Sequence, residues 1–193
     1  MNTSPVRPGT ELATQYHSSL TPGVSFFSDT CRDLLRGSIF DSRAPGFVSG
    51  AICDKHTLNA CFLGLPHWAC QPEQSVNYVS CHDDYTLFDR LTLVNPDAPR
   101  QTLIRQNRLA AAFVFLSQGV PFLQAGEEIL RTKPKGRGKF DENSYRSPDR
   151  VNAIRWDTLE SPEYQETLAH YKGLIAFRKA HEGLRQTGRE AVQ

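Results

Sequence analysis

The sequence NYVSCHDD occupies residues 77 to 84, and it decides how the rest of the chain is interpreted. Residues 77 to 80 favour a short strand, and a histidine with two aspartates follows almost at once: His82, Asp83 and Asp84. Buried strands seldom end in such groups, because every polar side chain then needs a partner, and an active site is one place that supplies partners. In a barrel of parallel strands, the C-terminal strand ends hold the catalytic residues. The segment therefore predicts a functional site at a strand end.

Strands and helices alternate on both sides of this segment. Short apolar runs predict buried strands over residues 24 to 27, 76 to 80 and 120 to 124. Patterns with helical spacing predict helices over residues 29 to 36, 54 to 63, 84 to 91, 100 to 117 and 161 to 181. Such alternation is typical of an α/β fold in which helical crossovers join parallel strands. Three parallel strands do not close a barrel, and they leave two open edges that a finished domain seldom tolerates.

Capping residues mark several of these boundaries. Ser28 is placed to cap the helix that starts at residue 29, and Gly37 is placed to end it. Gly119 is expected to be the C-cap of the helix over residues 100 to 117, and Ser161 the N-cap of the last helix. Residues 133 to 147 are basic and poor in apolar side chains, which predicts a long loop that is functional or mobile.

The charge composition argues against nucleic acid and membranes as partners. Lysine and arginine number 22 and aspartate and glutamate 21, so the formal net charge is +1. A chain without a strong charge excess has little electrostatic attraction to nucleic acid or acidic lipid. No apolar run is long enough to span a bilayer, and residues 1 to 10 lack the apolar core of a secretory signal.

The cysteines favour free, reduced thiols. Their number, five, is odd, and no CxxC pair occurs among Cys31, Cys53, Cys61, Cys70 and Cys81. A zinc site usually takes ligands in close pairs, and a disulfide framework is typical of small cysteine-dense chains, so we expect neither. Reduced thiols in turn favour a cytoplasmic location. A Cys81–His82 nucleophilic pair is also disfavoured, because adjacent strand residues point to opposite faces.

Two strand ends and one loop carry candidate site residues, each with a plainer alternative. Asp83 can face a substrate with His82 beside it, or Asp83 or Asp84 can cap the following helix. Glu127 and Glu128 can add acidic groups to the same surface, or they can simply complement the dipole of a first helical turn. Polar and aromatic groups such as Asn143 and Tyr145 suit a sugar-binding groove, although the same loop can be merely solvated.

Four segments of the chain, in the right order, resemble type I pullulanases, which are debranching enzymes of the alpha-amylase superfamily. Residues 78 to 89 (YVSCHDDYTLFD) resemble the seventh-strand motif. Residues 26 to 37 resemble the sixth strand and its helix, and residues 118 to 128 resemble the eighth strand. Residues 142 to 152, with the sequence ENSY at their start, resemble the loop that follows it.

The resemblance implies a partial (β/α)8 TIM barrel, comprising roughly the last three strand–helix units. It implies a glycoside hydrolase that cleaves α-1,6-glucosidic bonds with retention, with a branched α-glucan (pullulan, starch or glycogen) as substrate. Asp83 then corresponds to the carboxylate that stabilises the transition state, and His82 corresponds to a substrate-binding neighbour. Asn143 and Tyr145 correspond to the loop that borders the substrate groove. Neither a cofactor nor a metal ion is expected.

The chain departs from the family pattern in two ways. Asp84 stands where the family usually has asparagine, which alters only the local hydrogen bonding. The nucleophilic aspartate of the fourth strand and the acid/base glutamate of the fifth strand have no counterparts in this sequence. The isolated chain is therefore expected to be inactive.

The expected organisation has three parts. Residues 1 to 23 form a poorly ordered lead-in, residues 24 to 184 form the C-terminal part of a catalytic barrel, and residues 185 to 193 form a tail. The leading interpretation is a segment of a debranching hydrolase. The alternative is a non-catalytic fragment that binds glucan or assembles with a partner.

Overall fold

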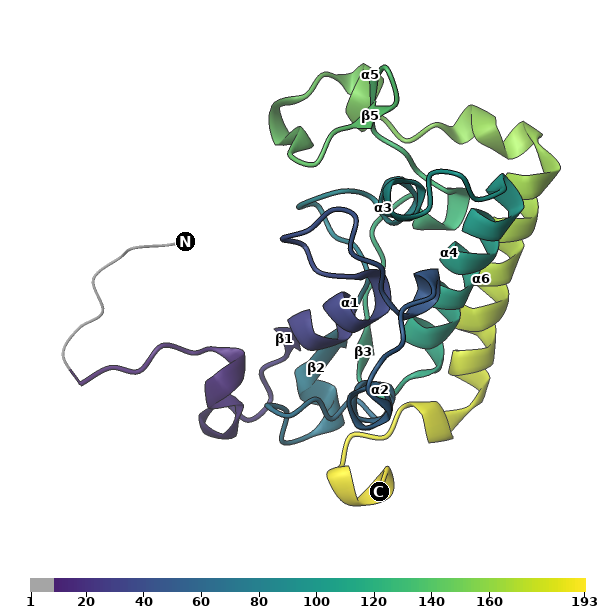
Figure 1. The fold of residues 1–193 in the computed structure, drawn as a ribbon. Coiled ribbons are helices and arrows are strands. Elements are labelled where there is room, and N and C mark those ends of the chain that lie inside the picture. Colours follow the sequence, from purple (N-terminus) through teal and green to yellow (C-terminus); the bar gives the residue numbers. More distant parts are fainter. Residues whose placement is uncertain (1–8) are drawn as a thin grey trace.

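Three short parallel strands form the centre of the fold in the computed structural model, which describes residues 9 to 193 (Figure 1). They are β1 (Phe26–Phe27), β2 (Ser75–Asn77) and β3 (Val120–Pro121), and their order in the sheet is β1-β2-β3. In the register, Val76 of β2 lies opposite Phe27 on one side and Val120 on the other. The prediction of parallel strands linked by helices is confirmed. Within residues 9 to 193, β1 and β3 each have a neighbour on one side only.

The strands are shorter than the apolar runs that predicted them. Pairing between two strands stops where either partner ends, and the edge strands β1 and β3 are each two residues long. β2 therefore ends at Asn77, although the apolar run continues through Tyr78 and Val79, which remain buried. The predicted strand at residues 76 to 80 is thus only partly a strand, and residues 78 to 80 continue it as buried irregular chain.

The first two helices begin at side-chain caps. Ser28 accepts a hydrogen bond from the backbone N–H of Cys31 at 3.3 Å, and α1 (Asp29–Arg36) follows it, as predicted. Gly37 ends α1 with a φ of 95°, a left-handed conformation that favours glycine. α2 (Lys55–Phe62) starts in the same way, because the Asp54 carboxylate accepts a hydrogen bond from the N–H of Thr57 at 2.8 Å.

The helix after the central strand starts later than the sequence predicts. α3 spans Leu87–Val94, whereas helical spacing predicted residues 84 to 91. Asp84 has a φ of 67°, which lies outside the right-handed helical region and excludes it from the helix. Thr86 is the N-cap instead, and its hydroxyl accepts a hydrogen bond from the N–H of Asp89 at 3.2 Å. The alternative in which Asp83 or Asp84 caps this helix is therefore wrong.

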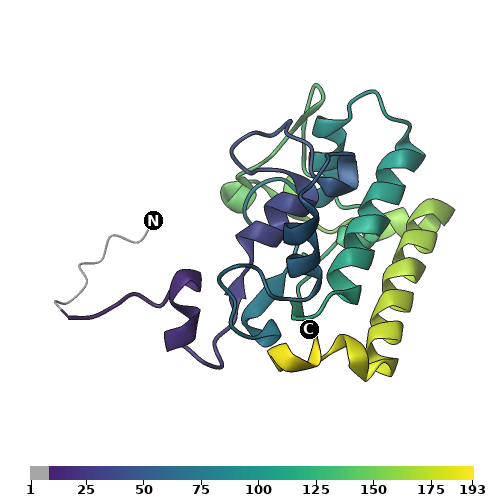
Figure 2. The same cartoon turned by 60° about the horizontal axis from the view of Figure 1, so that its bottom comes forward.

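Two long helices, α4 (Arg100–Leu116) and α6 (Pro162–Ala180), lie side by side in both ribbon views (Figures 1 and 2). α4 ends at Ser117 rather than at the predicted C-cap Gly119. Arg178 of α6 explains the difference, because its guanidinium donates to the backbone carbonyls of Phe115 at 3.0 Å and Ser117 at 2.6 Å. A cation at the C-terminus of a helix satisfies carbonyls that have no partner within the helix.

The main hydrophobic core lies between α1, α3 and α4. Its members share nearly complete burial, and they include Leu35, Val79, Leu87, Leu91, Leu103, Ile104 and Val114. A second cluster joins α4 to α6, where the rings of Phe115 and Tyr171 meet edge to face with centroids 6.2 Å apart. The apolar second half of α4 thus contributes to both clusters, on two of its sides.

Residues 133 to 147, predicted to be a loop, contain a small hairpin. β4 (Pro134–Gly136) pairs antiparallel with β5 (Lys139–Phe140), and the short helix α5 (Asp149–Asn152) follows. The 3-10 turns of the described chain are η1 (Gln15–Leu20), η2 (Phe47–Ser49), η3 (Pro72–Gln74), η4 (Glu127–Ile129), η5 (Ser144–Arg146), η6 (Trp156–Glu160), η7 (Glu182–Leu184) and η8 (Arg189–Ala191). Among residues 9 to 193, no helix combines the length and the apolar character needed to cross a membrane.

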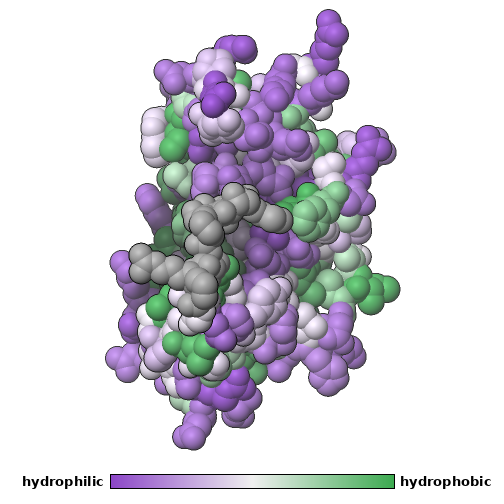
Figure 3. Space-filling view, turned by 90° about the vertical axis from the view of Figure 1, so that its left-hand side faces the viewer, coloured by the Kyte–Doolittle hydropathy of each residue, from purple (hydrophilic) through white to green (hydrophobic). Residues whose placement is uncertain are grey.

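The two ends of the chain make contacts with the body of the fold. Residues 1 to 8 of the predicted lead-in lie outside the described residues. Within the rest of it, Ser18 is buried, and its carbonyl accepts a hydrogen bond from Gln74 at 2.8 Å. The predicted tail contacts the same region, because Arg189 donates to the carbonyl of Ala69 at 2.8 Å. The surface on the lead-in side carries apolar side chains between polar regions (Figure 3).

Candidate functional site

A cavity of about 340 Å³ lies where the ends of β1 and β2 meet. Because the strands are parallel, their C-terminal ends share one edge of the sheet. The end of β1 contributes Phe27 and Asp29, and the chain after β2 contributes Tyr78 and residues 80 to 84. Three side chains from α1 and the following loop complete the lining: Arg32, Arg36 and Ile39. The NYVSCHDD segment therefore forms one wall of a cavity.

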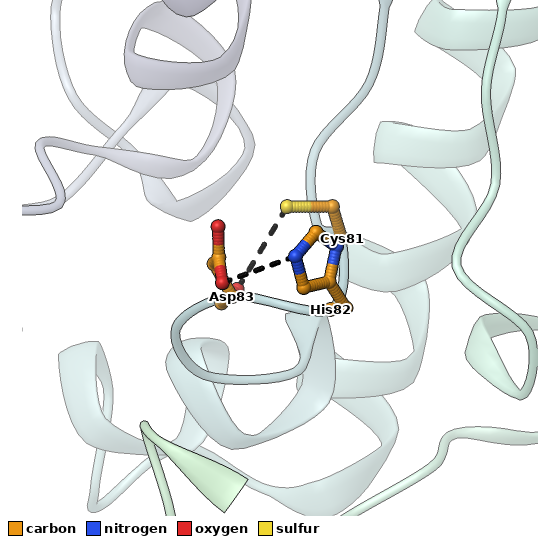
Figure 4. A group of neighbouring side chains, drawn as sticks. All are labelled: Cys81, His82 and Asp83. Carbon is orange, nitrogen blue, oxygen red and sulfur yellow. Dashed lines mark hydrogen bonds and ion pairs between the residues drawn. The ribbon is translucent and has the colours of Figure 1, made fainter. Parts of the chain in front are cut away.

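His82 and Asp83 lie together at the open side of this cavity. The Nε2 atom of His82 is 3.2 Å from the Oδ1 atom of Asp83, and both side chains reach into solvent, with exposed fractions of 87% and 80%. Figure 4 shows the two groups facing each other, with the sulfur of Cys81 beside them. The Cys81 Sγ contacts the backbone carbonyl of Asp83 at 3.9 Å. An accessible carboxylate with a ring N–H beside it can accept hydrogen bonds from a ligand in the cavity.

Asp84 has a different role from its neighbour. Its Oδ2 atom forms an ion pair with Arg36, a side chain of which only 1% is exposed, and its Oδ1 atom accepts the N–H of Tyr85 at 2.7 Å. Arg36 also donates to the carbonyls of Val79 at 3.1 Å and Tyr85 at 3.3 Å. Arg36 thereby fixes both ends of the loop that carries His82 and Asp83, and Asp84 is a structural anchor of that loop.

A wall of the cavity that the sequence did not predict comes from Asp29, Arg32 and Tyr78. The Arg32 guanidinium donates to Asp29 at 2.6 Å and to the Tyr78 hydroxyl at 2.8 Å, and that hydroxyl donates to Asp29 at 3.1 Å. Burial, more than the nearby charges, raises the pKa of Tyr78. The Tyr78 ring also meets Phe27 edge to face, with centroids 4.9 Å apart. The spacing of Asp29 and Arg32, one helical turn apart, was the available signal for this wall.

The acidic pair after β3 lies behind the cavity wall and does not line it. Glu127 is buried, and its Oε1 atom accepts hydrogen bonds from the Ser80 hydroxyl and from the N–H of Gln124 at 3.3 Å. Burial raises the pKa of Glu127 to about 8, against the opposing effect of the Ser80 hydrogen bond. Glu128 turns the other way, and it accepts the N–H of Gly126 at 2.9 Å. The alternative in which both acids add to the exposed strand-end surface is therefore wrong for Glu127, which lies behind the strand end and is hydrogen-bonded to Ser80.

The structure does not bring Asn143 and Tyr145 into the cavity lining. Their loop is anchored by Asp141, which accepts the N–H of Asn143 at 3.2 Å. Tyr145 is 72% exposed, and the Arg146 guanidinium lies 5.1 Å from the centroid of its ring. The loop nevertheless adjoins the chain after β2: burial raises the pKa of Tyr85, and the neighbouring Glu142 carboxylate raises it further.

Similar proteins are found by sequence and by structure. No protein-family model matches the chain. The pullulanase of Bacillus subtilis (strain 168) is 33% identical over 192 residues, which covers 96% of this chain and 26% of the relative. Pullulanase 1 of Arabidopsis thaliana, a chloroplastic protein, is 42% identical over 88 residues, which covers 45% of this chain and 9% of the relative.

The solved structures give the same result. Pullulanase type I from Bacillus subtilis, complexed with maltose, superposes with a TM-score of 0.89 at 32% identity and covers 99% of this chain. A pullulanase mutant from Paenibacillus barengoltzii, complexed with maltotetraose, gives a TM-score of 0.86 at 37% identity over 93% of the chain. The chain spans about a quarter of the length of these bacterial relatives, 26% and 28% of the two structures. By sequence and by structure, the chain belongs to the type I pullulanase family and corresponds to a C-terminal region of its members.

Proposed function

We propose that this chain is the C-terminal part of the catalytic barrel of a debranching glycoside hydrolase. The proposed substrate is a branched α-glucan such as pullulan, starch or glycogen, and the proposed reaction is hydrolysis of its α-1,6-glucosidic bonds with retention. Two observations support a partial (β/α)8 barrel: the three parallel strands with helical crossovers, and a sheet with a free edge on each side within residues 9 to 193. In this proposal residues 24 to 184 are the barrel part, and residues 1 to 23 and 185 to 193 flank it.

The position of Asp83 is the observation that carries the proposal. Its carboxylate is 80% exposed, it borders the cavity, and it follows the central strand at the edge where barrel enzymes hold their catalytic groups. A negative charge at that place can stabilise the oxocarbenium-like transition state of a retaining glycosidase. His82 is the proposed substrate-binding neighbour, since its ring already faces Asp83 at 3.2 Å and has room to donate to a sugar hydroxyl.

The other acids at the cavity are unsuited to the two bond-making roles. A retaining glycosidase needs a nucleophilic carboxylate and a carboxylic acid about 5 Å apart. Asp29 is held by Arg32 at 2.6 Å and Asp84 by Arg36, so both carboxylates are already engaged by cations. We therefore propose that the nucleophile and the acid/base come from a segment outside this sequence, and that the isolated chain does not hydrolyse glucan.

Asn143 and Tyr145 complete the proposal at the edge of the substrate groove. The exposed Tyr145 ring offers an apolar face of the kind that packs against sugar rings, and the amide of Asn143 offers both a donor and an acceptor for hydroxyl groups. The pullulanases that resemble this chain in structure have been solved with maltose and maltotetraose, which supports a glucan as the ligand class.

Two measurements on the purified chain test this proposal. Incubation with pullulan is expected to release no reducing sugar, because the chain supplies one of three carboxylates. Reducing sugar release that disappears in Asp83→Ala would contradict it. Titration with maltotetraose separates the proposal from a glucan-binding fragment: the proposal expects no saturable binding by the isolated chain, whereas a binding module would saturate and would lose affinity in His82→Ala and Tyr145→Ala.

A further inference from the structure

We propose that Cys81, His82 and Asp83 form a binding site for a thiophilic divalent cation of the zinc class. These three consecutive residues present one thiol, one imidazole and one carboxylate at the mouth of the cavity (Figure 4). Their candidate ligand atoms all lie within 4.8 Å of one another. Among residues 9 to 193, these three are the histidine, cysteine and acidic side chains that lie close enough together to share one metal ion.

The spacing of the three groups is close to that of a tetrahedral site. Zinc binds sulfur at about 2.3 Å and nitrogen or oxygen at about 2.0 to 2.2 Å, so tetrahedral ligand atoms lie roughly 3.3 to 3.8 Å apart. The His82 and Asp83 atoms, at 3.2 Å, already have that separation. The remaining closure is about 1 Å, and the exposed His82 and Asp83 side chains can supply it by rotation, since 87% and 80% of their surfaces are free.

The types of ligand select the cation. A thiolate with an imidazole and a carboxylate suits Zn²⁺ and its softer analogue Cd²⁺, whereas Mg²⁺ and Ca²⁺ require oxygen ligands. Three protein ligands leave a fourth position, which water can fill from the adjoining cavity of about 340 Å³. The sequence predicted no zinc site, because it contains no close pair of cysteines. A loop can nevertheless bring a thiol, an imidazole and a carboxylate together without such a pair.

The charges around the cavity leave Asp83 available to a cation. Arg32 is neutralised by Asp29 at 2.6 Å and Asp33 at 2.7 Å. Arg36 is neutralised by Asp84. Within the described part of the chain, the ion partner of Asp83 is His82, a group that is itself a metal ligand when neutral. Binding of a cation would therefore exchange one exposed His–Asp contact for three coordination bonds.

One consequence rests on the proposed function. The cation would occupy the same His82 and Asp83 groups that we propose for glucan, so metal and sugar would exclude each other in the complete enzyme. The site itself is testable without glucan, and its failure is thus distinguishable from failure of the proposed function.

The test is titration of the purified, reduced chain with ZnCl2 by calorimetry and with CdCl2 by ultraviolet absorption, which reports cadmium–thiolate bonds. We expect one ion per chain. Cys81→Ser should abolish the cadmium–thiolate absorption, and His82→Gln and Asp83→Asn should each weaken zinc binding by roughly tenfold or more. Cys53→Ser and His67→Gln are matched controls, since Cys53 is also partly exposed, and both should bind within about twofold of the parent chain.

Two results would overturn the site. Cadmium–thiolate absorption that survives Cys81→Ser places the thiolate elsewhere. Zinc affinity that is unchanged in both His82→Gln and Asp83→Asn shows an ordinary thiol rather than a three-ligand site. Circular dichroism of each variant verifies that the fold is intact, and the exposure of His82 and Asp83 makes these two substitutions structurally mild.

Discussion

The buried carboxyl of Glu127 makes the stability of this chain depend on pH. Glu127 lies behind the cavity wall, where its Oε1 atom accepts hydrogen bonds from Ser80 and from the N–H of Gln124. Burial raises its pKa to about 8, with a further contribution from the charge of Glu128. Glu127→Gln keeps the shape and the Oε1 acceptor but removes the titration. Comparing the two chains therefore isolates the effect of one proton.

The sign and size follow from the two pKa values. The ordinary pKa is 4.5 and the folded pKa is about 8, so the folded chain holds a proton that the unfolded chain releases. The stabilisation from that proton is complete below the ordinary pKa and is lost as the pH rises through the folded pKa. Between them, the free energy of unfolding falls by about 1.4 kcal/mol per pH unit. The loss between pH 5 and pH 8 is then about 3 to 4 kcal/mol.

The assay is urea unfolding of the parent chain and Glu127→Gln at four pH values from 5 to 8. The difference between their free energies of unfolding should change by about 3 to 4 kcal/mol across this range, and the parent chain should become less stable relative to the variant as the pH rises. Glu160→Gln is the matched control, because Glu160 is exposed, and it should run parallel to the parent chain. Parallel curves for the parent chain and Glu127→Gln would refute the reasoning.

Two further substitutions test the supports of the site and of the helix pair by urea unfolding. Arg36→Met leaves the Asp84 carboxylate without its cation and two backbone carbonyls without donors, so it should lower the free energy of unfolding by about 3 kcal/mol. The control Arg105→Met, at an exposed position, should change the free energy of unfolding by less than about 0.5 kcal/mol. A small effect of Arg36→Met would show that the loop does not depend on this ion pair. Tyr171→Phe removes the hydroxyl that donates to Asn107 at 3.0 Å in the buried contact between α4 and α6, so it should lower the free energy of unfolding by about 1.5 kcal/mol. Tyr145→Phe, at an exposed position, should leave the free energy of unfolding unchanged. Equal effects of the two substitutions would contradict the assigned burial.

Local signals in the sequence were sufficient to predict where α1, α2 and α4 begin. Ser28 and Asp54 cap α1 and α2, and α4 begins at Arg100 as its spacing predicted. These signals act within one turn and need no knowledge of the rest of the chain. Where the predictions were wrong, a distant or conformational effect intervened: Arg178 satisfies the end of α4 from another helix, and Asp84 adopts a positive φ that delays α3.

The candidate site also combines features that local sequence predicts with contacts that depend on distant residues. The sequence predicted that His82 and Asp83 lie together at a strand end, because both properties are local. It could not predict that Arg36 holds Asp84, or that Glu127 supports Ser80, since these partners are 48 and 47 residues apart. Contacts of that separation depend on the register of the sheet, which brings the ends of β1, β2 and β3 to one edge.

We propose that Asp83 acts in catalysis once the rest of a barrel is present. A chimera in which this chain replaces the corresponding quarter of the Bacillus subtilis pullulanase tests it most directly. We expect the folded chimera to release reducing sugar from pullulan. Asp83→Asn should lower the rate by about a thousandfold without changing the midpoint of thermal unfolding. Asp97→Asn, at an exposed turn, should leave the rate unchanged. A folded chimera that is inactive, or one whose activity survives Asp83→Asn, would contradict it.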